Sequence, residues 1–205
     1  MTKKNKVIGI GFHKTGTSTL RSVLTELGYE VLGSRPDLAS NLFNQEFEEV
    51  IALTESYDAF QDNPWPLLYK ELDKRYPNSK FILTLRNEEK WIKSSVNHFG
   101  TRDTEMRRWI YGMGHPQGYE NLYLEKYKNH NREVIAYFSK RKNDLLIIDW
   151  EKNIGWEELC EFLDEPIPNK PLPHVNKGDY SEKNKPASLI FNKALKRFLG
   201  KTDKG

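Results

Sequence analysis

The sequence predicts an α/β fold, in which a parallel sheet carries helices on both of its faces. Short apolar runs rich in β-branched residues occur at 7–10, 81–85 and 145–148, a pattern typical of buried parallel strands. Segments with helical periodicity follow these runs, and a loop of glycine, threonine and serine joins the first run to the first helix. Strands that alternate with helices build three layers, and ligands bind beyond the carboxyl ends of such strands.

The opening of the chain has the clearest pattern. The strand predicted at 7–10 ends at Gly11. After the loop, apolar residues occupy the i, i+3, i+4 and i+7 positions of one helix face: Leu20, Val23, Leu24 and Leu27. Gly28 then stands where a glycine commonly ends a helix. The chain therefore begins with a strand, a loop and a helix, and the loop lies at the helix N-terminus.

The rest of the chain continues the alternation in a single domain that spans 1–205. A further strand is predicted at 57–61, and further helices at 42–53, from Pro66, and at 88–97, 120–141, 156–163 and 187–199. The inner positions of the 120–141 helix are expected to be Leu124, Tyr127, Val134, Ile135 and Phe138. Residues 99–143 interrupt the alternation and are predicted to form a helical insertion.

Composition and charge limit the classes of protein that fit this sequence. The 205 residues carry a net charge of +3, which is too small an excess to indicate a nucleic-acid partner. The single cysteine, Cys160, excludes an intrachain disulfide and lies among apolar residues, so we expect it in the core of a protein from a reducing compartment. The apolar runs are too short for a signal peptide or a membrane span. We therefore expect a soluble, cytoplasmic protein without a membrane partner.

The first candidate site is the loop Gly11-Phe12-His13-Lys14-Thr15-Gly16-Thr17-Ser18-Thr19. At a helix N-terminus its backbone N–H groups and the helix dipole favour an anion. The spacing is close to that of the nucleotide-binding P-loop, G-x-x-x-x-G-K-[ST], so we expect a P-loop-like sheet. Thr17, however, stands where that motif has its lysine, and the cation has moved to Lys14. This change argues against ordinary nucleoside triphosphate hydrolysis.

The second candidate site follows the strand predicted at 81–85. Arg86 stands at the carboxyl end of this strand, and Ser94 follows eight residues later in the next helix. An arginine fork at a strand end suits a phosphate, and the serine is placed to bind the same anion. The alternative is a surface arginine paired with Glu88 or Glu89.

Together the two motifs resemble those of sulfotransferases that use 3′-phosphoadenosine 5′-phosphosulfate (PAPS). The run from His13 to Ser18 resembles the 5′-phosphosulfate loop of that family, and the segment from Arg86 to Ser94 resembles its 3′-phosphate segment. The order of elements across 146–176 is also similar to the C-terminal part of many members. The resemblance implies that PAPS is the co-substrate, that 3′-phosphoadenosine 5′-phosphate (PAP) is the product and that no metal is required.

The resemblance also implies roles for individual residues. Lys14 matches the loop lysine that contacts the 5′-phosphosulfate and stabilises the leaving group. The other residues implied to bind the co-substrate are His13, Thr15, Gly16, Thr17, Ser18, Thr19, Arg86 and Ser94. Lys177 corresponds loosely to a basic loop that closes over the co-substrate in relatives, with an exposed loop lysine as the alternative.

The implied reaction moves a sulfuryl group to a hydroxyl of a small molecule or a carbohydrate, and it needs a general base. Asp62, at the end of the strand predicted at 57–61, is the first candidate. A helix N-cap before Pro64 is the alternative role for this aspartate. His98, which follows the helix predicted at 88–97, is the second candidate. The predicted catalytic residues are therefore Lys14, Asp62 and His98.

Aromatic residues gather near the predicted insertion. They either line an acceptor pocket or form a small separate core, and they are Trp65, Phe99, Trp109, Tyr111, Tyr119 and Tyr123. The sequence also leaves two other functions open. An atypical P-loop kinase or nucleotidase would need an acidic Mg²⁺ ligand, for which Asp149 is the candidate. A domain of this type could also bind PAP or another nucleotide without turnover.

Overall fold

The sheet is parallel throughout. The computed structural model describes residues 5–152 and 154–173, and its five strands follow the order β2-β3-β1-β4-β5. The strands are β1 (Val7–Gly9), β2 (Val31–Leu32), β3 (Ala59–Phe60), β4 (Lys80–Leu85) and β5 (Leu145–Asp149). The predicted α/β class with a P-loop-like parallel sheet is confirmed. The sequence analysis missed β2, because a strand of two residues is too short to show a period.

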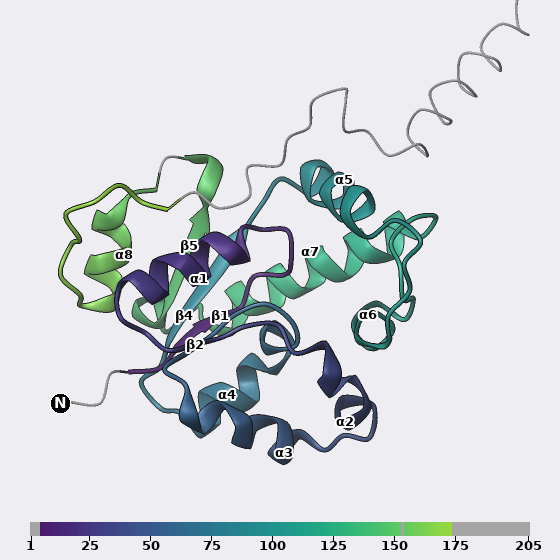
Figure 1. The fold of residues 1–205 in the computed structure, drawn as a ribbon, viewed down its shortest axis with the longest axis horizontal. Helices are drawn as coiled ribbons and strands as arrows, with labels where there is room; N and C mark the ends of the chain where they lie inside the picture. The colour runs from purple at the N-terminus through teal and green to yellow at the C-terminus, as the bar shows by residue number, and fades with distance from the viewer. Residues whose placement is uncertain (1–4, 153, 174–205) are drawn as a thin grey trace, which may run out of the picture.

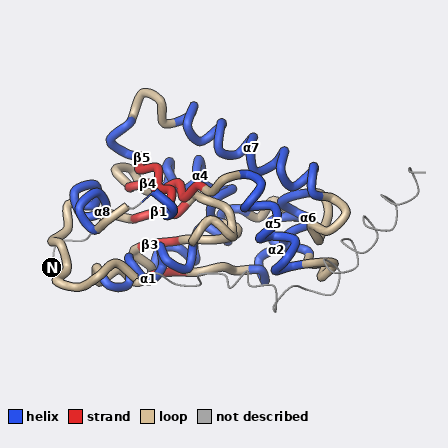
Figure 2. Tube along the Cα trace, turned by 90° about the horizontal axis from the view of Figure 1, so that it is seen from above, coloured by secondary structure: helices blue, strands red, loops and turns tan. Residues whose placement is uncertain are grey.

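Helices cover both faces of this sheet (Figure 1). One face packs against α1 (Thr17–Glu26) and α8 (Trp156–Leu163), and the other against α4 (Tyr69–Arg75) and α7 (Glu120–Tyr137). Figure 2 shows the strands between α7 and α1. The three-layer arrangement expected from the alternation of strands and helices is therefore present.

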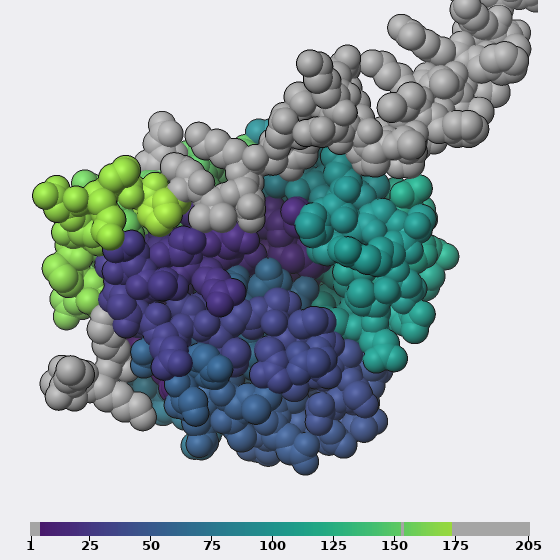
Figure 3. Space-filling view, in the orientation of Figure 1, coloured from purple at the N-terminus to yellow at the C-terminus, as the bar shows by residue number. Residues whose placement is uncertain are grey.

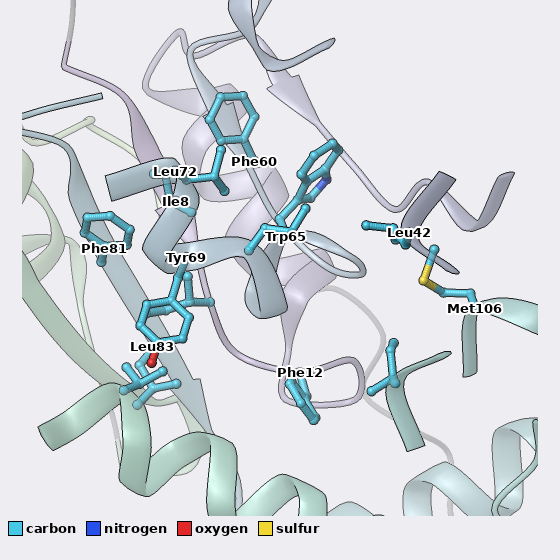
Figure 4. Close-up of a cluster of buried hydrophobic side chains, with 14 of the residues drawn as sticks. Ile8, Phe12, Leu42, Phe60, Trp65, Tyr69, Leu72, Phe81, Leu83 and Met106 are labelled. Atoms are coloured by element: carbon cyan, nitrogen blue, oxygen red, sulfur yellow. The ribbon is translucent and has the colours of Figure 1, made fainter. Parts of the chain in front are cut away.

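Side chains alternate between two cores along each strand. Val7 belongs to the core under α1 and α8, whereas Ile8 belongs to the core under α4 and α7. The same period of two separates Ile82 from Phe81 and Leu83 on β4. Figure 4 shows the larger core, where Ile8 and Phe81 lie with aromatic and aliphatic side chains from the helices. Burial of each such side chain contributes about 1.5–3 kcal/mol relative to exposure.

The strand order directs the loop after β1 towards a crevice. β1 lies between β3 and β4. The chain first crosses from β1 to β2 on one side of it, and after β3 it crosses back to β4 on the other side. The two crossovers therefore run in opposite directions along the sheet. Ligands of open α/β sheets bind at the carboxyl ends of strands at such a switch point. The phosphate-type loop begins at this point, directly after β1.

The structure corrects two predicted helices. The helix predicted at 42–53 is two short helices, α2 (Ala39–Phe43) and α3 (Phe47–Ala52). Gln45 lies between them with φ 61°, a left-handed conformation that interrupts a right-handed helix. In α7 the buried stripe is Tyr123, Tyr127, His130 and Val134. Ile135, predicted as an inner residue, is exposed because it follows Val134 by one position, about 100° around the helix.

The remaining elements connect these layers. They are η1 (Pro36–Leu38), η2 (Leu53–Ser56), η3 (Trp65–Leu68), α5 (Glu88–Phe99), α6 (Glu105–Tyr111), η4 (Lys142–Asp144) and η5 (Trp150–Lys152). Residues 99–143, predicted as a helical insertion, contain α6 and α7, and α7 belongs to the layer that covers the sheet. The helix predicted at 187–199 lies outside the described residues. None of the helices in the described part of the chain has the length and apolar character that a membrane span requires.

Candidate functional site

A cleft of about 900 Å³ lies at the carboxyl ends of the strands. Figure 3 shows the surface hollowed where the purple amino-terminal segment approaches the teal segment that follows β4. Every predicted site residue in the described part of the chain lines this cleft: His13, Lys14, Thr15, Gly16, Thr17, Ser18, Thr19, Asp62, Arg86, Ser94 and His98. Lys177, also predicted to bind the co-substrate, lies outside the described residues. The structure thus brings the two sequence motifs and both candidate bases into one site.

The loop after β1 depends on two backbone positions with positive φ. Lys14 has φ 65°, and Gly16, the N-cap of α1, has φ 93°. A Cβ on Gly16 would lie 2.4 Å from Cδ1 of Trp150, so only glycine lets the indole approach the loop. Gly11 has a similar constraint, since a Cβ there would lie 2.0 Å from the Thr84 hydroxyl oxygen. The loop is therefore pressed against the ends of β4 and β5.

Two threonines of the loop have hydroxyl groups that bond within the protein. The Thr15 hydroxyl donates to the carbonyl of Phe12 at 2.6 Å and lies 2.6 Å from the Thr84 hydroxyl. It fastens the loop to β4, a role that the sequence did not reveal. The Thr17 hydroxyl, at the position where a P-loop has its lysine, donates to Oδ2 of Asp62 at 2.9 Å. This bond connects the loop to the end of β3.

Arg86 lies at the end of β4 and bridges the two motifs. Its Nη1 donates to the carbonyl oxygen of Lys14 at 3.2 Å, and its Nε lies 3.7 Å from a carboxylate oxygen of Glu151. Ser94 is buried on the side of α5 that faces the cleft. Among the described residues, Arg86 forms its ion pair with Glu151 of η5, far along the chain, and not with Glu88 or Glu89. The arginine is thus held against the loop.

Asp62 is placed by a sharp turn after β3. Its φ is 68°, and its carboxylate accepts from the Thr17 hydroxyl and from the N–H of Asn63 at 2.7 Å. The N-cap of the following helix η3 is Pro64, without a side-chain cap, so the alternative capping role of Asp62 is wrong. Burial raises the pKa of the Asp62 carboxyl, opposed by these two hydrogen bonds and by Lys14.

Two histidines near the loop are shifted towards their neutral forms. Burial lowers the pKa of His13 to about 3, with further lowering by Arg107, Lys14 and His98. The His13 Nε2 lies 2.7 Å from the Tyr111 hydroxyl, and the ring stacks on Trp91, so this side chain is an anchored part of the wall. Burial also lowers the pKa of His98, followed by the charge of Lys14. Both shifts therefore favour the neutral form of the imidazole.

The structure adds lining residues that the sequence analysis missed. Among them are two arginines, Arg102 and Arg107, from the segment between α5 and the middle of α6. Isolated arginines at this spacing match no motif, and only the fold brings them to the cleft. Further missed lining residues are Ser34, Pro36, Asn63, Leu85, Thr104, Met106, Trp150 and Glu151.

The six aromatic residues considered for an acceptor pocket separate into different roles. Only Phe99 among them lines the cleft. The larger core contains Trp65, Tyr111 and Tyr123, with Trp109 packed against it, while Tyr119 is exposed. The prediction of an aromatic acceptor pocket is therefore wrong for five of the six. The interpretation as a separate core is wrong as well, because the buried ones join the main core.

Acidic groups in the cleft were considered as Mg²⁺ ligands. Asp149 lines the cleft, accepts from the N–H of Glu151 at 3.1 Å and lies 3.6 Å from Nζ of Lys152. Within residues 5–152 and 154–173, no three His, Cys, Asp or Glu side chains are grouped so that they could hold a metal ion. The predicted independence from metals stays a prediction.

Comparison with known proteins identifies the family. A family model described as a sulfotransferase domain matches residues 6–120 and 104–180. A protein of Aspergillus versicolor named Ava biosynthesis cluster protein M is 27% identical over an alignment of 221 positions, which covers 85% of this chain and 82% of that protein. Because the family model spans most of the sequence, including both motifs of the cleft, this chain belongs to the sulfotransferase domain family.

Proposed function

We propose that this transferase moves a sulfuryl group from PAPS to a hydroxyl of an acceptor, which gives PAP and a sulfate ester. One observation carries the proposal. Lys14 and Arg86 stand beyond the adjacent strands β1 and β4, are joined by the bond from Arg86 Nη1 to the Lys14 carbonyl, and line the same cleft as Asp62. The site thus offers separate cations for the two anionic ends of PAPS and a base beside them.

The donor groups present fit such an anionic co-substrate. The N-terminus of α1 and the N–H groups of its loop suit the 5′-phosphosulfate, with Lys14 beside them. Arg86 and Ser94 suit the 3′-phosphate, for which an arginine fork gives charge-assisted hydrogen bonds. PAPS supplies the activated sulfuryl group, and the protein supplies binding, orientation and charge.

The residues of the chain would divide the chemical work as follows. Asp62 takes the proton of the acceptor hydroxyl, whose oxygen forms a bond to sulfur as the bond from sulfur to the bridging oxygen breaks. The electron pair of the broken bond stays on the 5′-phosphate of PAP, where Lys14 stabilises the negative charge. The Thr17 hydroxyl holds Asp62 in place at 2.9 Å. Burial raises the pKa of Asp62, which makes its carboxylate a stronger base than an exposed one.

The acceptor is proposed to be a small molecule or a carbohydrate. The Aspergillus versicolor relative is named for a biosynthesis cluster, which supports a small-molecule acceptor. A kinase or nucleotidase is less well supported, because Thr17, at the position of the P-loop lysine, is bonded to Asp62.

Incubation of the purified chain with PAPS tests the proposal. A panel of phenols, alcohols and sugars serves as acceptors, and PAP and the sulfated products are measured together by mass spectrometry. Stoichiometric PAP and sulfate ester are expected with at least one acceptor. PAP binding without any sulfated product would contradict the proposal and favour a domain that binds the nucleotide without turnover.

A further inference from the structure

The cleft has two ends that differ in charge. One end is formed after β4 and β5, where Arg86, Asp149 and Glu151 line it. The other is formed after β2 and β3, where Ser34, Pro36, Asp62 and Asn63 line it. The sheet order puts β1 and its loop between the two ends. Since the proposed 3′-phosphate site at Arg86 occupies the first end, the acceptor belongs at the second.

Arg102 and Arg107 belong to the second end. Both line the cleft, and α6, which contains Arg107, packs against η1 and α2, the elements that follow β2. The two arginines thus stand on the same side of the loop as the candidate base.

Arg107 is a fixed and desolvated cation. Its side chain donates from Nε to the carbonyl of Gly114 at 2.8 Å and from Nη2 to the carbonyl of Arg102, and its guanidinium lies 4.3 Å from the centre of the Phe99 ring. It is only 7% exposed, and burial lowers its pKa. No ion pair with a carboxylate is present for it in the described part of the chain. The carbonyl bonds hold this charge in place without neutralising it.

Arg102 presents a second cation that is accessible. It is exposed, its guanidinium lies 5.9 Å from the same Phe99 ring, and it lines the cleft. Nearby Asp103 is paired with Arg108 at 2.8 Å. Asp62 is the single carboxylate among the described residues that line the second end of the cleft. The two arginines therefore give this end an excess of positive charge. The fields of Arg102 and Arg107 also contribute to the lowered pKa of His98.

We infer that the acceptor carries an anionic group, a carboxylate in the simplest case, that binds Arg102 in the field of Arg107 while its hydroxyl faces Asp62. This inference rests on the proposed function and specifies its acceptor class. A neutral acceptor gains less from these two positive charges than a carboxylate, which forms charge-assisted hydrogen bonds with the arginine fork of Arg102. Loss of one such bond is worth about 10–100-fold in affinity.

Matched pairs of acids and esters test the inference. Pairs of 4-hydroxyphenylacetate, 3-hydroxybutyrate and glucuronate with their methyl esters are titrated calorimetrically into the full chain saturated with PAP, and kcat/KM is measured with PAPS. The variants are Arg102→Gln and, as a control, Arg108→Gln, which removes the same charge from an exposed α6 residue outside the cleft. Arg107 is left unchanged because its Nε bonds to the Gly114 carbonyl and holds the bend at 112–114.

The expected result is that at least one acid binds tenfold or more tightly than its ester. Arg102→Gln should abolish this preference with PAP affinity unchanged, and Arg108→Gln should preserve it. Equal affinity for acids and esters, no binding of any acid, or a preference that survives Arg102→Gln would overturn the inference. PAP binding in the same titrations tests the proposed function separately. Normal PAP binding without a preference for acids would contradict only the inference of an anionic acceptor. Absence of PAP binding by the wild-type chain would contradict the proposed function itself.

Discussion

The hydroxyl of Tyr127 bonds to both backbone groups of Arg86. It accepts from the Arg86 N–H at 3.0 Å and donates to the Arg86 carbonyl at 2.9 Å. Tyr127 lies on α7 and its ring stacks on Trp91 of α5, with ring centres 4.3 Å apart. The backbone of the proposed 3′-phosphate ligand is therefore held by a helix of the core.

Tyr127→Phe is expected to weaken PAP binding through the 3′-phosphate alone. The change removes both bonds to Arg86, at a cost of about 1–3 kcal/mol in the free energy of unfolding. The affinity for PAP should fall several-fold, and Arg86→Ala should lower it further. The affinity for adenosine 5′-phosphosulfate, which lacks the 3′-phosphate, should change little in either variant. Thermal unfolding and calorimetric titration measure the two effects. Equal weakening of both ligands would show that Tyr127 does not act through Arg86.

Lys14→Ala is expected to lower kcat by roughly 10²–10³-fold, the typical effect of losing one donor that stabilises transition-state charge. PAP binding should remain measurable, because the loop N–H groups and Arg86 persist. Single-turnover kinetics with PAPS measures the effect on the chemical step. Lys90→Ala is the control: it removes an exposed lysine that pairs with Glu151 at 2.5 Å and does not line the cleft. Unchanged kcat in Lys14→Ala would exclude Lys14 from the mechanism.

Much of this site could be predicted because its determinants are local. Strand β4, the loop after β1 and the helix face of α1 are each encoded within a dozen residues. The position of Arg102 and Arg107 in the cleft could not be predicted, because it depends on how α6, which contains Arg107 and follows Arg102, packs against η1 and α2. His130 was also hidden, since a polar residue occupies a core position of α7 where its Nε2 lies 2.7 Å from the Ile10 carbonyl. Long-range packing of this kind leaves no period in a single sequence.

Gly16→Ala is expected to abolish PAP binding at concentrations that saturate the wild type. The added Cβ would lie 2.4 Å from Trp150 Cδ1, and φ 93° is strained for alanine. Gly28→Ala is the control that measures the effect of positive φ alone on the free energy of unfolding, because Gly28 has φ 79° and no atom lies within 4 Å of its Cβ position. This control should lose about 1 kcal/mol of stability and keep its PAP affinity. If the two variants bound PAP equally well, the contact between Gly16 and Trp150 would not shape the loop.

Asp62→Asn is expected to lower kcat/KM by about 10²–10⁴-fold, the usual contribution of a general base, and His98→Gln by less than tenfold. Because burial raises the pKa of the Asp62 carboxyl, the wild-type rate should fall as the pH decreases, with a midpoint above the ordinary value of 3.8.

The raised pKa of Asp62 also affects the stability of the fold. The protonated carboxyl is favoured in the folded state, and the stability that it contributes is lost as the pH rises through the folded-state pKa. At pH 7 Asp62→Asn should therefore unfold at the same or a higher temperature than the wild type.

The pH profile and the unfolding temperature distinguish a catalytic loss from a structural one. Loss of activity with preserved stability and PAP affinity supports Asp62 as the base. The reverse ranking of the two variants, with His98→Gln the more damaged, would transfer the role to His98.

Calorimetric titration of the purified chain with PAP, with and without Mg²⁺ and beside ATP, tests the central claim most directly. The arrangement of Lys14, Arg86 and Ser94 in one cleft predicts tight binding of PAP that does not depend on Mg²⁺, together with weak binding of ATP. Absent PAP binding, or ATP binding that requires Mg²⁺, would contradict the account and favour a nucleotide kinase.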